Sequence, residues 1–239
     1  MRSGHLHGWG HKVIFASDPW RFSANFERFR LAGSGALGRW LCRPLSDHPF
    51  LNLRTYVRSA AGPGIFFLAE WITNRLSHRL GPITHGLPYR LGTLTADNKR
   101  PGGTSSLSIE DGAGQGALRL MYPSRRDKPQ TAADGSLDAF LLERYIAYTV
   151  RQGTTRFFEV QHTPWHFERP DWIRADTTLL KTAFPWFAGA RMIGAHTSDG
   201  FENVYMGPPH KLPQKSAFRY AQTILPPHAH ATACGVAAN

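Results

Sequence analysis

The chain has few cysteines and no long apolar run, and these absences narrow its class. Its two cysteines, Cys42 and Cys234, lie near opposite ends of the 239 residues and form no C-x-x-C pair, so neither a disulfide framework nor a zinc site is expected. No apolar run approaches the ~20 residues of a membrane span. The first residues, MRSGHLHGWGHKVIF, lack the apolar stretch of an export signal. We therefore expect no membrane partner and a cytoplasmic location.

Familiar catalytic and cofactor motifs are also absent. The sequence contains no G-x-S-x-G, no H-E-x-x-H and no phosphate-binding loop. GSGALG at 33–38 fits the dinucleotide fingerprint, but scattered charges precede it and no acid follows about twenty residues later, which favours a chance match. The histidines of HLHGWGH and HAH lie in ends without a folding pattern, where nothing would hold a metal geometry. The sequence predicts no metal and no cofactor.

The net charge of +11 suggests nucleic acid, but its distribution argues against that partner. Residues 1–48 hold 7 Lys and Arg against 3 acids, and residues 209–239 hold 3 against none. Seven of the eleven charges therefore lie in flanks with little core-forming pattern, and basic flanks are usually solvated. No nucleic-acid motif is present. The sequence predicts no nucleic-acid partner, and it leaves the oligomeric state open.

Turn residues and alternating patterns are plentiful, and they predict a mainly β protein. The chain has 17 Pro and 23 Gly. A hairpin is predicted where TSSLSIED and ALRLMY flank a glycine-rich turn. GLPYRLGTLT is predicted to be extended. TRFFEVQH, residues 155–162, alternates with a period of two, which predicts a strand. Further strands are expected near 190–196 and 201–206. The residues after Pro208 carry no sustained pattern, which predicts disorder.

A second hairpin is expected in residues 51–71. LNLRTYVR alternates strictly, SAAGPG supplies a turn, and IFFLAEW is apolar on both faces. With a loop of about six or seven residues at 59–65, Arg54 lies directly opposite Glu70 on one face. A turn one residue shorter would place Arg54 against Ala69.

Three helices are predicted. SLDAFLLERYIAYTVRQG, residues 136–153, has Ser136 as a cap and Gly153 at its exit. Residues 72–80 fit a short helix that ends at Gly81-Pro82, and residues 177–183 fit a weaker one.

The pair Arg54 and Glu70 has two interpretations. On an outer face it is a surface salt bridge worth ~0 to 1 kcal/mol. Facing an enclosed interior, its charges must be matched, and a small anion can share the guanidinium. The aromatic and polar residues expected nearby, in packing or in ligand binding, are Tyr56, Tyr148, His162 and Trp165.

Several of these stretches carry a family pattern. Seven stretches occur in a fixed order along the chain: LNLRTYVR, GIFFLAEW, NRLSHRLG, HGLPYRLG, SLDAFLLERYIAYT, RFFEVQHTPWHF and FAGARMIGAHTSDGFENVYMGPP. Together they resemble the YqjF-like family of uncharacterised bacterial proteins, the domain of unknown function 2071, from about His48 to Pro209.

The resemblance implies a bent β-barrel similar to acetoacetate decarboxylase, with outer helices and a cavity. It favours the inward-facing interpretation of Arg54 and Glu70, because that superfamily holds a carboxylate with interior arginine and glutamate. The decarboxylases also need a lysine that forms a Schiff base. No Lys-Lys pair is present, and five lysines fall in predicted loops, ends or the weak helix: Lys99, Lys128, Lys181, Lys211 and Lys215. No catalytic lysine motif is identified, so the presence of enzymatic activity stays open.

The beginning of the chain departs from the family. Members open with strands that complete the barrel, and residues 1–48 do not match them; a divergent version and a shifted reading frame are both open. Without such strands the edge of the LNLR strand would be unpaired. We expect three parts: a divergent or poorly ordered segment at 1–47, a barrel domain at 48–209 and a disordered tail at 210–239.

These observations predict a protein that binds a small anionic or keto-acid-like molecule in a barrel cavity, with Arg54 and Glu70 as polar anchors. One alternative is an enzyme similar to acetoacetate decarboxylase. Another is a non-catalytic interaction module, or a truncated remnant of the family, in which the same residues only stabilise the sheet.

Overall fold

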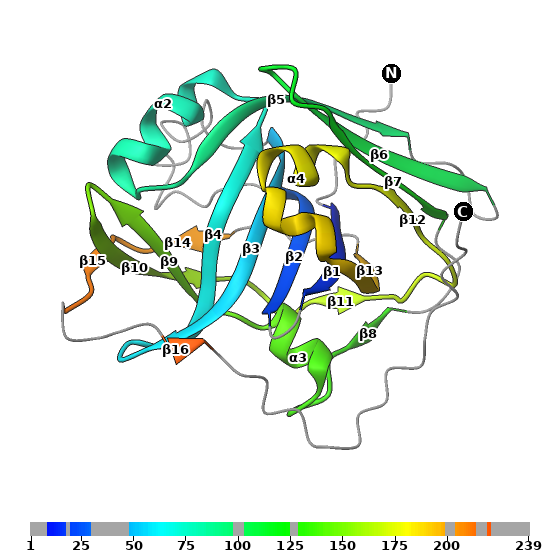
Figure 1. The fold of residues 1–239 in the computed structure, drawn as a ribbon. Helices are drawn as coiled ribbons and strands as arrows, with labels where there is room; N and C mark the ends of the chain where they lie inside the picture. The colour runs from blue at the N-terminus through cyan, green and yellow to red at the C-terminus, as the bar shows by residue number, and fades with distance from the viewer. Residues whose placement is uncertain are drawn as a thin grey trace, which may run out of the picture.

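The structure is a computed structural model, and it describes residues 9–17, 20–29, 48–97, 103–124, 129–198, 204–213 and 219–220. These residues form a mainly β fold with three α-helices and one 3-10 helix, which confirms the predicted fold class. The helices are α2 (Arg75–Thr84), α3 (Leu137–Leu142), α4 (Thr178–Ala183) and η1 (Pro185–Gly189). Figure 1 shows α4 in front of the central strands and α3 at their lower end.

Most strands belong to one curled sheet. They are β1 (Trp9–Ser17), β2 (Trp20–Phe29), β3 (His48–Ser59), β4 (Gly62–Ile72), β5 (Tyr89–Asp97), β6 (Thr104–Asp111), β7 (Ala117–Pro123), β9 (Ile146–Arg151), β10 (Thr154–Gln161), β12 (Arg174–Asp176), β13 (Arg191–Ser198), β14 (Tyr205–Met206), β15 (His210–Lys211) and β16 (Arg219–Tyr220). Two further strands, β8 (Gln130–Thr131) and β11 (His166–Phe167), form a small separate sheet. The main path runs β12-β7-β6-β5-β4-β3-β2-β1-β13; within the described residues its two ends do not pair, so it is a curled half-barrel.

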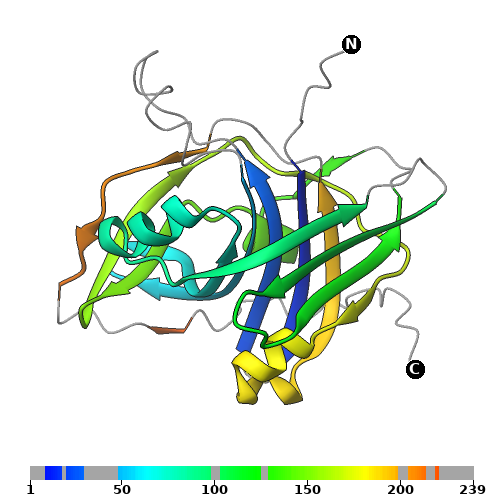
Figure 2. The same ribbon diagram turned by 90° about the horizontal axis from the view of Figure 1, so that it is seen from above.

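The sheet forks at β4. Near its start, β4 pairs in parallel with β9 through Ile65 and Phe66. At its end it pairs in parallel with β5 through Glu70, Trp71 and Ile72. In Figure 2 the blue strands β1 and β2 stand between the green strands β5 to β7 and the yellow-green β9 and β10. The strands β1 to β4 are therefore covered on both faces, with packed side chains in the space on each side.

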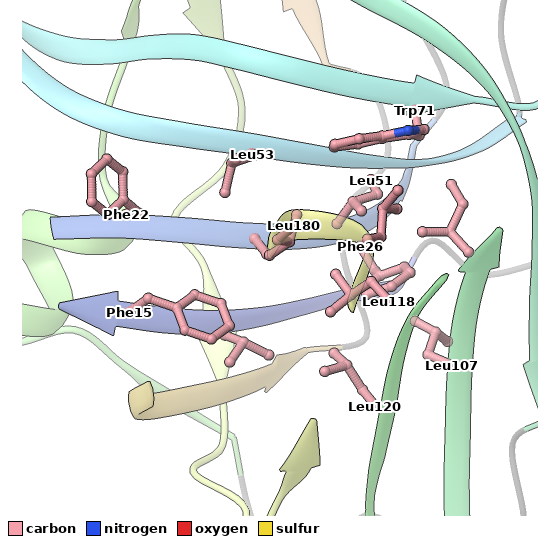
Figure 3. Close-up of a cluster of buried hydrophobic side chains, with 14 of the residues drawn as sticks. Phe15, Phe22, Phe26, Leu51, Leu53, Trp71, Leu107, Leu118, Leu120 and Leu180 are labelled. Carbon is pink, nitrogen blue, oxygen red and sulfur yellow. The ribbon is translucent and has the colours of Figure 1, made fainter. Parts of the chain in front are cut away.

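One of these spaces is filled by the main hydrophobic core. Side chains that alternate along β1 to β4 point into it and meet those of β6, β7, α4 and η1. The fully buried members drawn in Figure 3 include Phe26, Leu51, Leu53, Trp71, Leu107, Leu118, Leu120 and Leu180. Because side chains on a strand alternate between faces, the residues between these point to the opposite side of the sheet.

The hairpin of β3 and β4 is tighter than the sequence predicts. Ser59 pairs with Gly62, so the turn is two residues long and the expected loop at 59–65 is wrong. Gly62, at φ +121°, supplies the backbone conformation that this turn needs. A Cβ on Gly64 would lie 2.3 Å from the carbonyl oxygen of Ile146 on β9, so only glycine fits there. The glycines read as loop residues instead let β4 pack against β9.

The long helix predicted at 136–153 is only six residues long. Ser136 does cap α3, since its hydroxyl accepts a hydrogen bond from the Ala139 amide. After Leu142 the chain becomes β9, in which Ala147, Tyr148 and Thr149 are all buried. Aromatic and β-branched residues favour a strand that is covered on both faces, and here β4 and β10 supply the partners.

The other predicted elements are found close to their expected places. The hairpin of β6 and β7, the strands β5, β10 and β13, and the helix α4 correspond to the predicted segments. Helix α2 is shifted, because it continues past Gly81 and includes Pro82. No helix among the described residues has the length and apolar character to cross a membrane.

The described part of the first 47 residues is two strands of the sheet. β1 pairs with β13 and β2, and β2 pairs with β3 from Phe22 to Phe29. The edge of β3 is therefore covered, and residues 9–17 and 20–29 agree with the divergent alternative for this segment. In the predicted tail, β15 pairs with β10 and β16 with β3. The three-part domain division itself stays a prediction.

Candidate functional site

The candidate site lies on the face of β1 to β4 that is turned away from the main core. Along β2 the residues Phe22, Ala24 and Phe26 enter that core, while Ser23 and Asn25 point to the opposite side. The neighbouring strands add polar side chains in the same register. We call the resulting set the interior polar cluster; its members, all buried, are Lys12, Ser23, Asn25, Glu27, Asn52, Arg54, Tyr56, Glu70 and His196.

Arg54 forms an ion pair inside this cluster, though not with the expected residue. Its Nη1 lies 3.8 Å from Glu27 Oε1, and both side chains are less than a tenth exposed. A bulge in the β3 and β4 pairing places Arg54 opposite Phe67 and Asn52 opposite Glu70. The predicted direct pairing of Arg54 with Glu70 is therefore wrong, although both face the same enclosed space.

Glu70 lies at the fork of the sheet, where β4 leaves β9 and joins β5. It is 4% exposed, and its amide donates to the Pro88 carbonyl. Burial, together with the negative charge of Glu27, raises the pKa of Glu70 to about 8, against the opposing effect of Arg54. Glu70 is therefore a neutral carboxylic acid at pH 7, able to donate as well as accept a hydrogen bond.

Lys12 is a buried lysine on β1. Its Nζ donates to the Leu141 carbonyl at 2.6 Å and lies 5.8 Å from the centre of the Trp165 ring. Burial, and next the positive charge of Arg54, holds the pKa of Lys12 well below the ordinary 10.5. A lysine of this kind holds a larger share of neutral, nucleophilic amine than one in water.

Hydrogen bonds connect the centre of the cluster across the strands β2 and β3 and to the helix α3. Asn25 Nδ2 donates to Asn52 Oδ1 at 2.8 Å and to Ser23 Oγ at 3.1 Å. The Tyr56 hydroxyl lies 3.1 Å from Ser23 Oγ and 3.1 Å from the Leu141 carbonyl oxygen. These bonds fix the side chains on a rigid sheet, as a preorganised binding site requires.

His196 extends the cluster on β13, across from Lys12 in the strand register. Its Nε2 lies 2.8 Å from Asp138 Oδ1 on α3, and the other Asp138 oxygen accepts a bond from Arg169. Burial lowers the pKa of His196, even though the bond to Asp138 opposes this shift. The imidazole is therefore neutral at pH 7.

A cover formed by α3 and the segment around β11 closes the site. Leu142, Trp165 and Phe167 pack together as a small apolar cluster of their own. Two hydrogen bonds attach the cover to the sheet. The Leu141 carbonyl oxygen accepts one from Lys12, and the Asp138 carboxylate accepts the other from His196. Within the cover, the Trp165 amide donates to Glu143 Oε1 at 2.9 Å.

Five buried atoms of the cluster have no hydrogen-bond partner among the described residues. They are Asn25 Oδ1, Glu27 Oε1, Arg54 Nε, Glu70 Oε2 and His196 Nδ1. An unpaired buried polar atom costs ~1 to 3 kcal/mol, so such atoms are rare unless water or a ligand completes them. Their concentration in one place marks this region as a site.

A cavity of about 10 Å³ lies between the cluster and the cover. Its walls are Lys12, Asn25, Glu27, Leu142, Trp165, Phe167, His196 and Ser198. This volume holds roughly one water molecule. A larger guest would have to displace part of the cover.

Four of the six predicted site residues gather at this site. Arg54, Tyr56 and Glu70 belong to the cluster, and Trp165 lines the cavity. Tyr148 lies outside it: its hydroxyl bonds Ser59 and the Gly62 carbonyl oxygen in a separate apolar group. His162 lines an open groove of about 310 Å³ on the surface beside Tyr145.

The sequence interpretation missed Lys12, Asn25, Glu27 and His196. The signal for two of them is present in FSANFE, where apolar and polar residues alternate as strictly as in LNLRTYVR. No such signal identifies Lys12 or His196. Among the described residues, no group of three His, Cys, Asp or Glu side chains could hold a metal ion. The terminal histidine motifs lie outside what the structure describes, apart from the backbone of His11.

A family comparison now identifies the chain's relatives. Residues 28–199 match the family DUF2071, described as an uncharacterized conserved protein. The chain belongs to this family. The match begins at residue 28, near the end of β2 and twenty residues before His48, where the resemblance seen in the sequence begins.

Among individual relatives, the uncharacterized protein YqjF of Bacillus subtilis (strain 168) is 31% identical over 117 residues, covering 49% of this chain. The matched stretch spans 48% of that relative, about half its length. This similarity agrees with the predicted YqjF-like family.

Solved structures share the fold. Acetoacetate decarboxylase from Legionella pneumophila subsp. pneumophila str. Philadelphia 1 has a TM-score of 0.59 at 8% identity, covering 87% of this chain and 85% of that one. An acetoacetate decarboxylase-like enzyme from Sphingomonas wittichii RW1 gives 0.53 at 13%, covering 89% and 96%. The enduracididine biosynthesis enzyme MppR complexed with pyruvate gives 0.50 at 12%, covering 88% and 89%. At these identities the likeness shows the fold alone, and it agrees with the predicted acetoacetate decarboxylase-like architecture.

Proposed function

We propose that this protein binds a small carboxylate of the keto-acid type in the space above the interior polar cluster. The observation that carries the proposal is the set of five buried polar atoms in the cluster, Arg54 Nε among them, that have no hydrogen-bond partner among the described residues. A guanidinium matches the geometry of a carboxylate, and the neutral Glu70 acid adds a hydrogen-bond donor beside it. Nearby Lys12 supplies a further donor when protonated.

The size of the ligand determines what must move. A keto acid is several times larger than the cavity of about 10 Å³, so binding requires the apolar part of the cover to move aside while Asp138 keeps its contact with His196. The apolar group in the cover, Leu142 with Trp165 and Phe167, is small and separate from the main core. Opening at this point leaves that core intact, so a guest can enter while the main core stays packed.

The fold supports the same class of ligand. MppR, which shares the fold, has been solved with pyruvate bound. A cytoplasmic location, a bacterial source and the absence of a nucleic-acid partner stay predictions from the sequence.

A thermal-shift series with pyruvate, acetoacetate and acetate tests this proposal. Wild type should be stabilised by at least one of the keto acids. Arg54→Lys keeps a positive charge beside Glu27 but loses the forked guanidinium, so its ligand stabilisation should fall. Arg119→Lys, at an exposed position of β7, is the matched control and should respond like wild type. No stabilisation of wild type, or equal stabilisation in Arg54→Lys, would contradict the proposal.

A second candidate function is an enzyme that forms an imine with a ketone substrate, and Lys12 is the observation that favours it. The Lys12 amine would attack the carbonyl carbon, the carbonyl oxygen would leave as water, and a C=N bond would join the substrate to Nζ. The low pKa of Lys12, caused by burial and by Arg54, provides the neutral amine that this step needs.

Borohydride trapping tests the enzyme candidate. Incubation with acetoacetate and sodium borohydride, followed by mass spectrometry of peptides, should find a reduced adduct on Lys12. Lys12→Arg should show none, whereas Lys181→Arg, on the exposed side of α4, should still be modified at Lys12. Absence of an adduct on wild type under these conditions would rule out the imine and leave binding as the function.

A further inference from the structure

His196 and Asp138 form a hydrogen-bonded pair that crosses from the sheet to the cover. His196 is 4% exposed, and its ring packs edge-on against Phe167 with centroids 4.7 Å apart. Asp138 Oδ1 lies 2.8 Å from Nε2, and a carboxylate accepts hydrogen bonds. Nε2 therefore carries the proton of the neutral ring. The lone pair must then lie on Nδ1, the nitrogen that is buried and has no partner among the described residues.

The ring occupies the wall of the cavity. His196 shares that wall with Lys12, Asn25 and Glu27, and Lys12 faces it directly across the β1 and β13 pairing. A neutral imidazole with a free lone pair beside a cavity is a proton acceptor. None of the hydrogen bonds that build the cluster uses this nitrogen.

The charges around the pair suit proton transfer. Burial would raise the pKa of Asp138, but the bond and charge of His196 and the charge of Arg169 outweigh this and lower it overall. Asp138 therefore stays a carboxylate at neutral pH. It can stabilise the imidazolium that forms when Nδ1 takes a proton, as the buried aspartate of a catalytic triad does.

We propose that His196, positioned by Asp138, removes a proton from the carbon next to the carbonyl of a keto acid bound in the cavity. The inference rests on the proposed function and adds a reaction to it. The C–H proton moves to Nδ1, the electron pair of that bond becomes a C=C bond, and the carbonyl becomes an enolate whose oxygen takes the negative charge. Lys12, which lines the cavity, can donate a hydrogen bond to that oxygen, and the Arg54 cation lies on the same face of the sheet. Return of a proton from solvent through Nδ1 regenerates the keto acid, so no further reactant is consumed.

Hydrogen-deuterium exchange measures this step without knowledge of any final product. Pyruvate and 2-oxobutyrate in D₂O, with catalytic protein, are followed by proton NMR at the carbon next to the carbonyl. Wild type should accelerate exchange above the buffer rate. His196→Gln should lower the catalysed rate by about 100-fold, because the glutamine amide can still donate to Asp138 but offers no basic nitrogen. Its Kd for the keto acid should stay within about twofold of wild type.

Asp138→Asn tests the positioning role. An asparagine amide can donate to Nε2, which would shift the ring proton to Nδ1 and remove the lone pair from the cavity. The exchange rate at saturating keto acid should fall by about tenfold or more, with the Kd little changed. A residue that only supports the fold would not separate rate from binding in this way. His166→Gln, on the exposed side of β11, is the matched control and should exchange at the wild-type rate.

The outcomes separate this inference from the binding proposal. Wild type that binds a keto acid without accelerating exchange overturns the role of His196 and leaves the binding proposal intact. Catalysed exchange in His196→Gln within twofold of wild type also overturns it. Wild type that binds neither keto acid removes both. If circular dichroism shows that His196→Gln does not fold, the rate of Asp138→Asn decides by the same criterion.

Discussion

The Arg54 guanidinium and the Glu27 carboxylate form an ion pair within an enclosed space, 3.8 Å apart, each side chain less than a tenth exposed. Removing one partner of a buried pair leaves the other charge uncompensated, which typically costs ~3 to 5 kcal/mol. Arg54→Ala should therefore lower the free energy of unfolding by about that amount in urea at pH 7. Arg119→Ala breaks the exposed pairs with Glu110 and Asp176 and should cost less than ~1 kcal/mol. Similar losses in the two variants would show that the Arg54 pair is not buried.

Glu70 should make stability depend on pH. Its pKa rises from 4.5 to about 8 in the folded protein, through burial and the nearby Glu27, so the folded state binds this proton more tightly than the unfolded state. This contribution is complete below pH 4.5 and is lost as the pH rises toward 8. Glu70→Gln lacks the titration. In urea unfolding at pH 5, 6, 7 and 8, the free energy of unfolding of wild type should fall relative to that of the variant as the pH rises. A difference between the two proteins that does not change with pH would disprove the raised pKa of Glu70.

The buried amine of Lys12 should lower the stability of the folded protein at neutral pH. Burial and Arg54 lower its pKa in the folded state, so the unfolded chain binds the proton more tightly and stability falls as the pH drops below 10.5. Lys12→Met keeps most of the side-chain volume and removes the buried amine. Its Tm at pH 7 should exceed that of wild type, and the gain should shrink at higher pH. Lys181→Met, at an exposed position of α4, should change Tm little. A lower Tm for Lys12→Met would mean that its bond to Leu141 outweighs the burial cost.

The fork of the sheet should depend on Gly64. A Cβ there would come within 2.3 Å of the Ile146 carbonyl oxygen and 2.7 Å of the Tyr148 ring. Gly64→Ala should therefore push β4 and β9 apart and destabilise the protein by ~1 to 3 kcal/mol in urea unfolding. Gly189→Ala is the matched control, since nothing lies within 4 Å of its added methyl group. Equal effects at the two positions would contradict the close approach.

The local parts of the fold could be predicted from the sequence, and the non-local parts could not. Alternation in LNLRTYVR is a property of neighbouring residues, so it identifies β3 without knowledge of its partners. The register with β4 depends on a bulge beside Arg54 and on the approach of Ile146 to Gly64, which no pattern within the hairpin contains. The prediction that Arg54 and Glu70 share a face held, while their direct pairing did not.

The same limit explains the missed site residues. Lys12 is important because α3, 129 positions away, presents its Leu141 carbonyl to the amine. His196 depends in the same way on Asp138, 58 positions away. Each residue looks ordinary in its own segment, and only tertiary structure brings the two contacts to one cavity. The predicted helix at 136–153 failed for a related reason, since β4 and β10 provide the pairing that turns Ile146–Arg151 into a strand.

The strands β1 to β4 bury side chains on both faces, and this restricts the sequence changes that the protein can accept during evolution. A single inserted or deleted residue within β2 would turn its side chains to the opposite faces of the sheet. Ser23, Asn25 and Glu27 would then enter the main hydrophobic core. Phe22, Ala24 and Phe26 would point into the interior polar cluster. Length variation should therefore be confined to the connections between strands. New ligand preferences would have to arise by replacing one side chain at a time at every second position.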